Sequence, residues 1–361
     1  MLIRYGTSPE GKPVKKAEVY TAEDHHIDPA LIDVDAHKII RRLRREGFKA
    51  FIVGGAVRDL LTGLKPKDFD IATDAFPRRI RKIFRNSRII GRRFRLAHIY
   101  AQRDGKRKIL EVSTFRSSQS EEPRRRGKQK QKSNSIYGRM EEDVWRRDFT
   151  LNALYYCPER RIIVDFVGGY RDIQQGKICT LIPADASFRE DPVRMIRGIK
   201  YAELTGFALP MTVTAAIKRH RHKLAECSAA RLTEEVYKIL GSGYAAGILL
   251  RAYRLRLLEV FMPALHEHWR SLGRRQMVES MRTGLGVLDQ RIKKDSADGV
   301  SRGSMLADLM KSFSGRWRMD TVHEELIGSV VGWIQMTCRP MIPSRKESER
   351  AARLLRRWIT A

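Results

Sequence analysis

Short apolar runs alternate with amphipathic stretches in the first half of the chain. Residues 51–53 (Phe-Ile-Val) form a run of β-forming residues that ends at Gly54 and Gly55. This pattern predicts a short buried strand followed by a sharp turn, where the absence of a Cβ lets the backbone approach a ligand closely. Before the strand, residues 28–48 carry apolar side chains at helical spacing after Asp28-Pro29, which predicts an amphipathic helix.

The rest of the chain predicts a change of architecture along its length. Residues 77–84 are expected to form a helix, and residues 99–102 and 108–115 two neighbouring strands joined by a turn at 103–105. Beyond residue 172 helical periodicity dominates to the end. The pattern therefore predicts an α+β protein with a small mixed sheet followed by an all-helical region.

Charge adds a partner class to this picture. The 361 residues include 71 Lys and Arg against 42 Asp and Glu, a formal net charge of +29. Such a surplus is typical of proteins that neutralise phosphates. No apolar stretch is long enough to cross a bilayer, and the first twenty residues lack the apolar core of a signal sequence. The four cysteines are widely spaced, which favours free thiols in a reducing cytoplasm over a disulfide frame or a zinc site.

Two aspartates follow the glycine turn closely. Asp68 and Asp70 flank Phe69, so in an extended strand both carboxylates leave the same face. Like charges at this distance repel unless a divalent cation lies between them, and oxygen ligands suit Mg²⁺ or Mn²⁺. Backbone N–H groups at Gly54 and Gly55 could hold phosphate oxygens. The combination indicates metal-assisted chemistry on a nucleoside triphosphate.

Arg58 lies just after the turn and has two interpretations. Its planar guanidinium is placed to meet triphosphate oxygens. Alternatively, Arg58 forms an ion pair with Asp59 or Asp68. Both remain open at this level.

The motifs carry a resemblance to a known family. GGAVRD (residues 54–59) followed by DFD (68–70) resembles the signature of the class II nucleotidyltransferases of the DNA polymerase beta superfamily, which comprise poly(A) polymerases and tRNA CCA-adding enzymes. The resemblance continues to about Leu240, in the family's order, through IIGRRFRLAHI (89–99), EVSTFR (111–116), EEDVWRRDFTLNALYY (141–156), DFVGGYRDI (165–173) and REDPVRMIRGIKYA (189–202). It implies a DNA polymerase beta-like nucleotidyltransferase head followed by a helical neck, body and C-terminal region.

The resemblance also implies a third carboxylate in the metal cage, and two residues match. Glu111 lies in a strand expected beside the aspartates, and we assign it with Asp68 and Asp70 to the metal ions. Asp148 matches the acidic position of the family's RRD motif and is assigned to the nucleotide pocket or metal shell; it could also cap a helix over residues 149–156. Arg147 matches a family arginine that contacts the incoming nucleotide. The sequence does not choose between Glu111 and Asp148 as the third catalytic carboxylate.

Base recognition is expected in REDPVRMIR. On a helix begun at Pro192, Asp191 and Arg194 share a face, and Arg197 continues it. A carboxylate can accept from an exocyclic amine while a guanidinium donates to a ring nitrogen. The resemblance implies this use of the motif as a protein template for ATP or CTP; the alternative is a plain salt bridge between Asp191 and Arg194.

The expected domain organisation follows from these segments. Residues 1–27 are expected to form a flexible arm, 28–170 the head, 171–240 a helical neck with the recognition motif, and 241–361 a helical body with a basic RNA-binding end. Within the head, residues 117–139 are rich in Arg, Lys, Gln and Ser and predict a mobile loop, which is either a solvated insertion or a guide for the RNA 3′ end.

The leading hypothesis is a cytoplasmic, template-independent polynucleotide adenylyltransferase that adds AMP from ATP to RNA 3′ ends, as in mRNA polyadenylation. Residues 89–98 (IIGRRFRLAH) resemble the poly(A) polymerase pattern more than the CCA-adding one. The alternative is a tRNA nucleotidyltransferase that adds CCA or only its terminal A.

Overall fold

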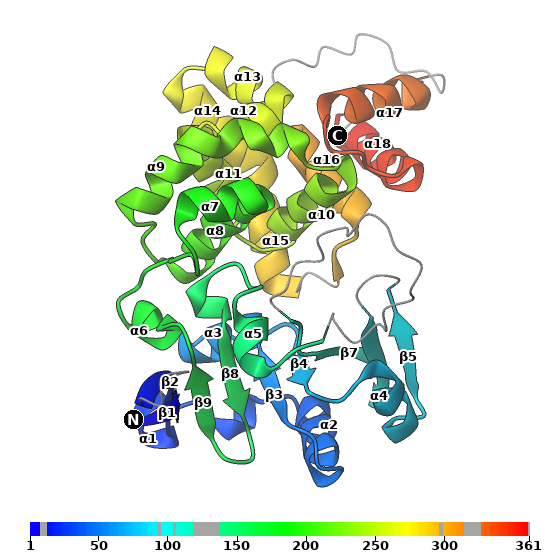
Figure 1. Cartoon of the computed structure of the whole chain (residues 1–361). Coiled ribbons are helices and arrows are strands. Elements are labelled where there is room, and N and C mark those ends of the chain that lie inside the picture. The colour runs from blue at the N-terminus through cyan, green and yellow to red at the C-terminus, as the bar shows by residue number, and fades with distance from the viewer. Residues whose placement is uncertain are drawn as a thin grey trace, which may run out of the picture. The chain divides into compact units, whose positions relative to one another are not determined.

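The structure, a computed structural model, describes residues 1–7, 13–91, 95–103, 106–117, 137–295, 299–313 and 326–359. The chain divides into two compact units, Met1–Leu181 and Ile182–Ala361. Among the described residues, every strand lies in the first unit and the second unit is helical (Figure 1). The predicted α+β class is therefore confirmed. The division falls later than the expected boundary at residue 170, and the separation of a neck from a body stays a prediction.

A nine-stranded mixed sheet organises the first unit, in the order β1-β2-β9-β8-β3-β4-β7-β6-β5. Strands β4 and β7 pair in parallel, and the other pairings between named strands are antiparallel. The strands are β1 Leu2–Thr7, β2 Pro13–Tyr20, β3 Ala50–Val53, β4 Asp70–Thr73, β5 Ser87–Ile90, β6 Leu96–Arg103, β7 Lys106–Thr114, β8 Leu154–Cys157 and β9 Ile162–Asp165.

Short helices accompany this sheet. Helix α2 packs against β3 and β4 and buries Ile39, Ile40 and Leu43. The helices of the unit are α1 Ala22–His25, η1 Pro29–Leu31, α2 Val34–Arg45, α3 Gly55–Leu61, α4 Pro77–Ile83, α5 Met140–Val144, η3 Thr150–Asn152 and α6 Gly169–Gln174. The predicted helix at 77–84 and the strands at 99–102 and 108–115 are confirmed as α4, β6 and β7.

The helix expected over 28–48 is interrupted at its start. Asp28 caps only the short 3-10 turn η1 by accepting from the Ala30 N–H, 2.8 Å away. The amphipathic helix α2 begins after Asp33, whose Oδ1 accepts from the N–H groups of Asp35 and Ala36. Asp33 offers the same capping chemistry five residues later, so the two aspartates divide the segment.

The expectation of a flexible arm at 1–27 is wrong. β1 pairs with β2, and β2 pairs with β9 through Tyr20 and Ile163, so both strands extend the sheet. The end of β2 is buried from Ala17 to Tyr20. This segment is polar by local composition, and its order comes from pairing with a strand more than a hundred residues away, which local patterning does not reveal.

The helix considered over 149–156 is also wrong. The segment forms the 3-10 turn η3 and then β8, whose Tyr155 and Tyr156 are fully buried. Tyr156 pairs with both Ile52 and Ile163 across the sheet. Aromatic residues fit a buried central strand well, and tertiary pairing decides between the two structures.

The second unit is built entirely of helices around one apolar core. Within the segment expected to form the neck (171–240), α10 buries Leu232, Val236, Ile239 and Leu240. The elements are α7 Ala184–Glu190, α8 Val193–Thr205, α9 Met211–His220, η4 Arg221–Glu226, α10 Ala229–Leu240, α11 Ala245–Arg254, α12 Leu258–Phe261, α13 Pro263–Ser271, α14 Arg274–Met281, η5 Arg282–Gly286, α15 Val287–Asp295, α16 Arg302–Lys311, α17 Leu326–Thr337 and α18 Arg345–Ile359. Within the described ranges, no helix is long and apolar enough to cross a membrane.

Candidate active site

Three carboxylates gather on neighbouring strands of the sheet. Asp68 and Asp70 lie at the start of β4, with the Phe69 side chain buried between them. The parallel register pairs Ile71 with Val112, which places Asp70 beside Glu111 of β7. Asp68 and Asp70, two positions apart, and Glu111, about forty positions later, therefore converge through a single strand pairing.

Electrostatics confirm that these groups influence one another. The pKa of Asp70 is raised to about 6, first because protein atoms crowd its carboxyl and then because Glu111 and Asp68 add negative charge. Arg147 opposes the shift. Asp68, Asp70 and Glu111 nevertheless all keep exposed surface, so an ion or a triphosphate can reach them.

Glu111 has a neighbour that the sequence did not reveal. His98 of β6 is its cross-strand partner, and His98 Nε2 lies 3.2 Å from Glu111 Oε1. Since β6 and β4 flank β7 on opposite sides, His98 contacts the Glu111 carboxylate from the side away from Asp70. The signal available in the sequence was only its membership of the IIGRRFRLAH motif.

Asp148 occupies a different environment. It is buried, and its Oδ1 accepts from the Phe149 N–H at 2.9 Å and from the Asn152 side chain at 3.1 Å. The strand row that contains Asp70 thus includes Glu111 and not Asp148. This arrangement favours Glu111 as the third carboxylate, and Asp148 as a residue that orients the turn η3.

The glycine turn brings Arg147 to the site. Gly54 has φ +71°, a left-handed conformation that favours glycine, and a Cβ there would lie 3.6 Å from an Arg147 guanidinium nitrogen. Asp143 holds Arg147 through a 3.0 Å ion pair, and Asp143 also accepts from the Tyr155 hydroxyl at 2.7 Å. Burial alone would lower the Arg147 pKa, but Tyr155 and Asp143 raise it overall, so Arg147 stays a fixed cation.

Arg58 is engaged inside the protein. Its Nε and one terminal nitrogen donate to Asp59 Oδ1 at 2.8 and 2.6 Å, and the other terminal nitrogen donates to Asn152 at 3.0 Å. Only 8% of its side chain is exposed, and its guanidinium lies 3.4 Å from where a Gly55 Cβ would be. Arg58 therefore forms the ion pair with Asp59 that the second interpretation predicted, and its contact with triphosphate oxygens stays a prediction.

The carboxylates do not yet form a closed coordination shell. Among the residues that the structure describes, no group of three or more His, Cys, Asp or Glu side chains is arranged to hold a metal ion. The donor chemistry nevertheless fits one, because the three groups offer only hard oxygen ligands, and the negative charges of Glu111 and Asp68 add to the effect of burial in raising the Asp70 pKa. A divalent cation is the charge that would relieve this repulsion.

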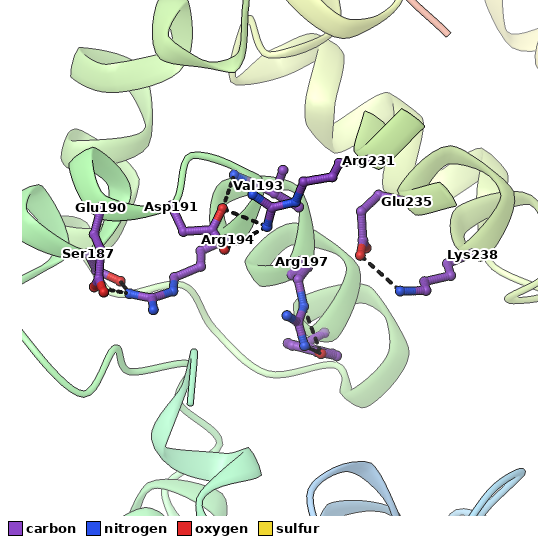
Figure 2. Close-up of polar contacts among 10 residues, drawn as sticks. Ser187, Glu190, Asp191, Val193, Arg194, Arg197, Arg231, Glu235 and Lys238 are labelled. Atoms are coloured by element: carbon purple, nitrogen blue, oxygen red, sulfur yellow. Dashed lines mark hydrogen bonds and ion pairs between the residues drawn. The ribbon is translucent and has the colours of Figure 1, made fainter. Parts of the chain in front are cut away.

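The predicted recognition motif lies in the second unit and differs from the expected helix face. α8 starts at Val193 with Pro192 as its cap, so Asp191 precedes it in an extended conformation at the end of α7. Figure 2 shows Asp191 and Arg194 directed to different partners. The alternative of a salt bridge between Asp191 and Arg194 is therefore not what the structure shows.

Arg231 of α10 holds Asp191 instead. One terminal nitrogen of Arg231 donates to both carboxylate oxygens of Asp191, at 3.0 and 2.9 Å (Figure 2). The sequence analysis did not identify Arg231, although this residue lies within the expected neck, residues 171–240. The contact turns the Asp191 carboxylate into a fixed acceptor.

Arg194 is positioned with equal definition. It is 8% exposed, and one terminal nitrogen donates to the Ser187 hydroxyl at 3.1 Å and to Glu190 at 2.9 Å. Its Nε and second terminal nitrogen make no hydrogen bond to the described residues, so these donors remain for a ligand. Arg197 lies further along α8 and donates to the Tyr201 hydroxyl at 3.0 Å (Figure 2).

Residues 118–136 of the expected mobile loop lie outside the described residues, as do Arg92 and Arg93.

The second unit contains a pocket of about 550 Å³. None of the predicted site residues lines it; its lining is Glu203, Ala208, Leu209, Thr214, Gly247, Leu250, Arg251, Arg254 and Leu255.

Family models match both units. Residues 50–179 match the poly A polymerase head domain, and residues 206–268 match a region described as the probable RNA and SrmB-binding site of polymerase A. The first match contains the sheet residues of the candidate site, from Gly54 to Asp148. Asp191, Arg194 and Arg197 fall between the two matches.

Similar proteins carry two activities in their names. Poly(A) polymerase I of Salmonella typhimurium is 38% identical over 281 residues, which cover 76% of this chain and 59% of that protein. The CCA-adding enzyme of Geobacillus kaustophilus is 38% identical over 211 residues, covering 58% of this chain and 50% of that protein. A crystal structure of the Bacillus stearothermophilus CCA-adding enzyme in complex with CTP aligns with a TM-score of 0.57 and 26% identity, over 90% of this chain and 82% of that one.

The chain thus spans about three fifths of the length of the poly(A) polymerases it matches. The two family models, the extent of the sequence similarity and the shared fold agree with one another. The chain belongs to the poly(A) polymerase and tRNA nucleotidyltransferase family.

Proposed function

We propose that this protein is a template-independent polynucleotide adenylyltransferase that transfers AMP from ATP to RNA 3′ ends, as in mRNA polyadenylation, with release of pyrophosphate. The observation that carries the proposal is the row of Asp70 and Glu111 on paired strands, with Asp68 next to it and Arg147 as the facing cation. Poly(A) polymerase I relatives match a larger share of the chain than the CCA-adding enzymes do, 76% against 58%.

Asp68, Asp70 and Glu111 would hold Mg²⁺ or Mn²⁺. When bound, such ions supply activation of a hydroxyl nucleophile and neutralisation of phosphate charge. His98 keeps the Glu111 carboxylate turned toward the row, and Arg147, held by Asp143, presents a cation to the triphosphate. Because these groups are already oriented, little reorganisation is needed when charge develops.

The base would be read by Asp191 and Arg194 in the second unit. Asp191 accepts from an exocyclic amine while Arg231 keeps its carboxylate in place, and Arg194 donates through the nitrogens that its protein partners leave available. Adenine and cytosine both present an amine next to a ring acceptor. Uracil and guanine do not present these two groups at the same edge, so they would leave Asp191 and Arg194 without hydrogen-bond partners. Arg197, beside Tyr201, is proposed as a further contact of the nucleotide.

The CCA-adding activity is the second candidate, because the solved structures that share this fold include CCA-adding enzymes. An assay with purified protein, a divalent cation, single nucleotides and two primers separates the candidates. One primer is a generic RNA, and the other is a tRNA without its 3′ CCA. A long ladder from ATP alone on the generic RNA supports polyadenylation, whereas a short discrete extension confined to the tRNA supports CCA or A addition.

A further inference from the structure

One segment of the first unit contains no acidic residue at all. Residues 75–103 hold ten Lys and Arg and no Asp or Glu, although acidic residues make up 42 of the 361 in the whole chain. The segment contains α4, β5 and β6. We define its exposed cations from the start of α4 to the end of β5 as the basic edge: Arg78, Arg79, Arg81, Lys82, Arg85 and Arg88.

The basic edge has no acidic partners among the described residues. Within the described ranges, none of its six cations forms an ion pair with a carboxylate. Arg81 donates to backbone carbonyls, those of Arg85 at 2.6 Å and of Ser87. The side chains are therefore displayed to solvent without neutralisation.

This arrangement is locally unfavourable for a helix. α4 has no acidic residue in its first turn, and Arg78 and Arg79 stand near its positive end. Arg78 and Lys82 are four positions apart on α4, and like charges at that spacing repel. A cluster of like charges that no described acidic residue neutralises points to an external partner of opposite charge.

Register connects the basic edge to the carboxylates. Arg88 of β5 pairs with His98 of β6, which pairs with Glu111 of β7, beside Asp70 of β4. Directly paired residues project from the same face of a sheet, so Arg88 faces the same side as the carboxylate row. Three strand spacings of roughly 4.8 Å put Arg88 about 14 Å from Asp70 along the sheet. Figure 1 shows β5 and α4 together at this end of the sheet.

Aromatic side chains adjoin the same surface. Phe76, just before α4, is 49% exposed and stacks edge-on against Tyr137 with ring centroids 5.2 Å apart. Cationic grooves with exposed aromatic rings are typical of surfaces that bind single-stranded nucleic acid, since the rings stack on bases of any sequence. An acidic protein or a lipid surface offers no base for these rings.

We propose that the basic edge binds the sugar–phosphate backbone of the RNA substrate upstream of its 3′ end and leads that end along β5 and β6 to the carboxylate row. This inference rests on the proposed function for the identity of the acceptor strand. It assigns primer binding to the sheet unit itself, in addition to the helical region that the family model describes as a probable RNA-binding site.

The test compares two triple variants of the full chain. In the first, Arg78, Arg79 and Lys82 are replaced by Gln. In the second, the control, Lys38, Arg270 and Arg345 are replaced by Gln; these side chains are 74%, 68% and 87% exposed and each has an acidic neighbour on its own helix. Both triples remove the same charge from solvent-exposed positions, so they separate loss of a site from loss of net charge.

Affinity for a labelled single-stranded RNA is measured by fluorescence anisotropy over a series of salt concentrations, without ATP or divalent cation. Loss of three phosphate contacts is expected to reduce the salt slope by about 2 and the affinity on the order of 100-fold near 0.1 M salt. The control triple should change the slope far less, and a variant with Lys at positions 78 and 79 should retain binding.

Equal losses of RNA affinity in the two triple variants would overturn the proposal. So would an edge triple that binds RNA normally but loses binding to phosphatidylserine vesicles. Because binding is measured without catalysis, the result holds even if the wild-type protein transfers no AMP. If it does transfer AMP, the edge triple should raise the KM for RNA while kcat and the KM for ATP stay unchanged.

Discussion

Charged side chains are arranged differently in the two units. In the helical unit two acidic residues are each matched by two basic groups: Asp308, 2% exposed, contacts both Arg291 and Lys311, and Asp185 contacts both Arg219 and His220. In the sheet unit the carboxylates of the Asp70 row repel one another, and the cations of the basic edge have no acidic partner within the described residues. Matched charges hold a fold together, whereas unmatched ones are kept for a partner that brings the missing charge.

The largest expected effect is on catalysis through the carboxylate row. Asp70→Asn should lower the rate of AMP incorporation by about 10³-fold, because several kcal/mol of transition-state stabilisation depend on the bound cations. The measurement is single-turnover extension of an RNA primer with radiolabelled ATP. Asp28→Asn removes the same charge from an exposed cap that Asn can also serve, and should keep full activity. An active Asp70→Asn protein would contradict the metal assignment.

The matched charges should give the opposite result. Asp308→Ala leaves two cations without their buried partner and should destabilise the helical unit by about 3 kcal/mol. Chemical denaturation followed by circular dichroism measures the loss, with the exposed Glu226→Ala as a control. The comparison between units would fail if Asp308→Ala were as stable as the wild type.

Base selection should change when Asp191 is replaced and, less strongly, when Arg231, which contacts the Asp191 carboxylate, is replaced. Asp191→Ala is expected to lower the ratio of kcat/KM for ATP over UTP by about 10- to 100-fold, the value of a hydrogen bond to a charged group. Arg231→Gln should shift the same ratio in the same direction by a smaller factor, since Asp191 remains but is no longer fixed. Arg302→Gln, which breaks an exposed pair with Glu234, is the control. Equal losses with every nucleotide would count against base recognition.

The smallest expected effect concerns stability and pH. The folded-state pKa of Asp70 is raised to about 6 from an ordinary value near 3.8, so without metal this group destabilises the fold progressively as pH rises from about 4 to 6. Asp70→Asn should therefore raise the Tm of the metal-free protein at pH 7 and leave it unchanged at pH 4. Mg²⁺ should raise the Tm of the wild type at pH 7 but not that of the variant. Scanning fluorimetry measures both shifts, and an identical response of the two proteins would contradict the repulsion.

The sequence predicted the elements whose signals are local. The strand before Gly54, the helix α4 and the hairpin of β6 and β7 follow from residue type and spacing within a few positions, and the Asp68–Asp70 pair follows from strand geometry. The position of Glu111 beside Asp70 depends on the parallel register of β4 and β7, which no local pattern contains.

The errors share one physical cause. β2 pairs with β9 and β8 pairs with β3, each about a hundred residues or more away in sequence, so the local composition of these segments was misleading. The partner of Asp191 was missed for the same reason, because Arg231 lies forty residues away on another helix. Contacts of this kind can be recognised only when the chain is folded.

The parallel pairing of β4 with β7 also has a consequence for how the protein folds. Strands β6 and β7 are close in sequence and can pair early, whereas β4 is separated from β7 along the chain by α4, β5 and β6. Non-local pairings of this kind form slowly, because the chain entropy of a long loop is lost before the contact is gained. The carboxylate row is thus completed late in folding, and a partly folded chain on the ribosome would have no assembled catalytic centre.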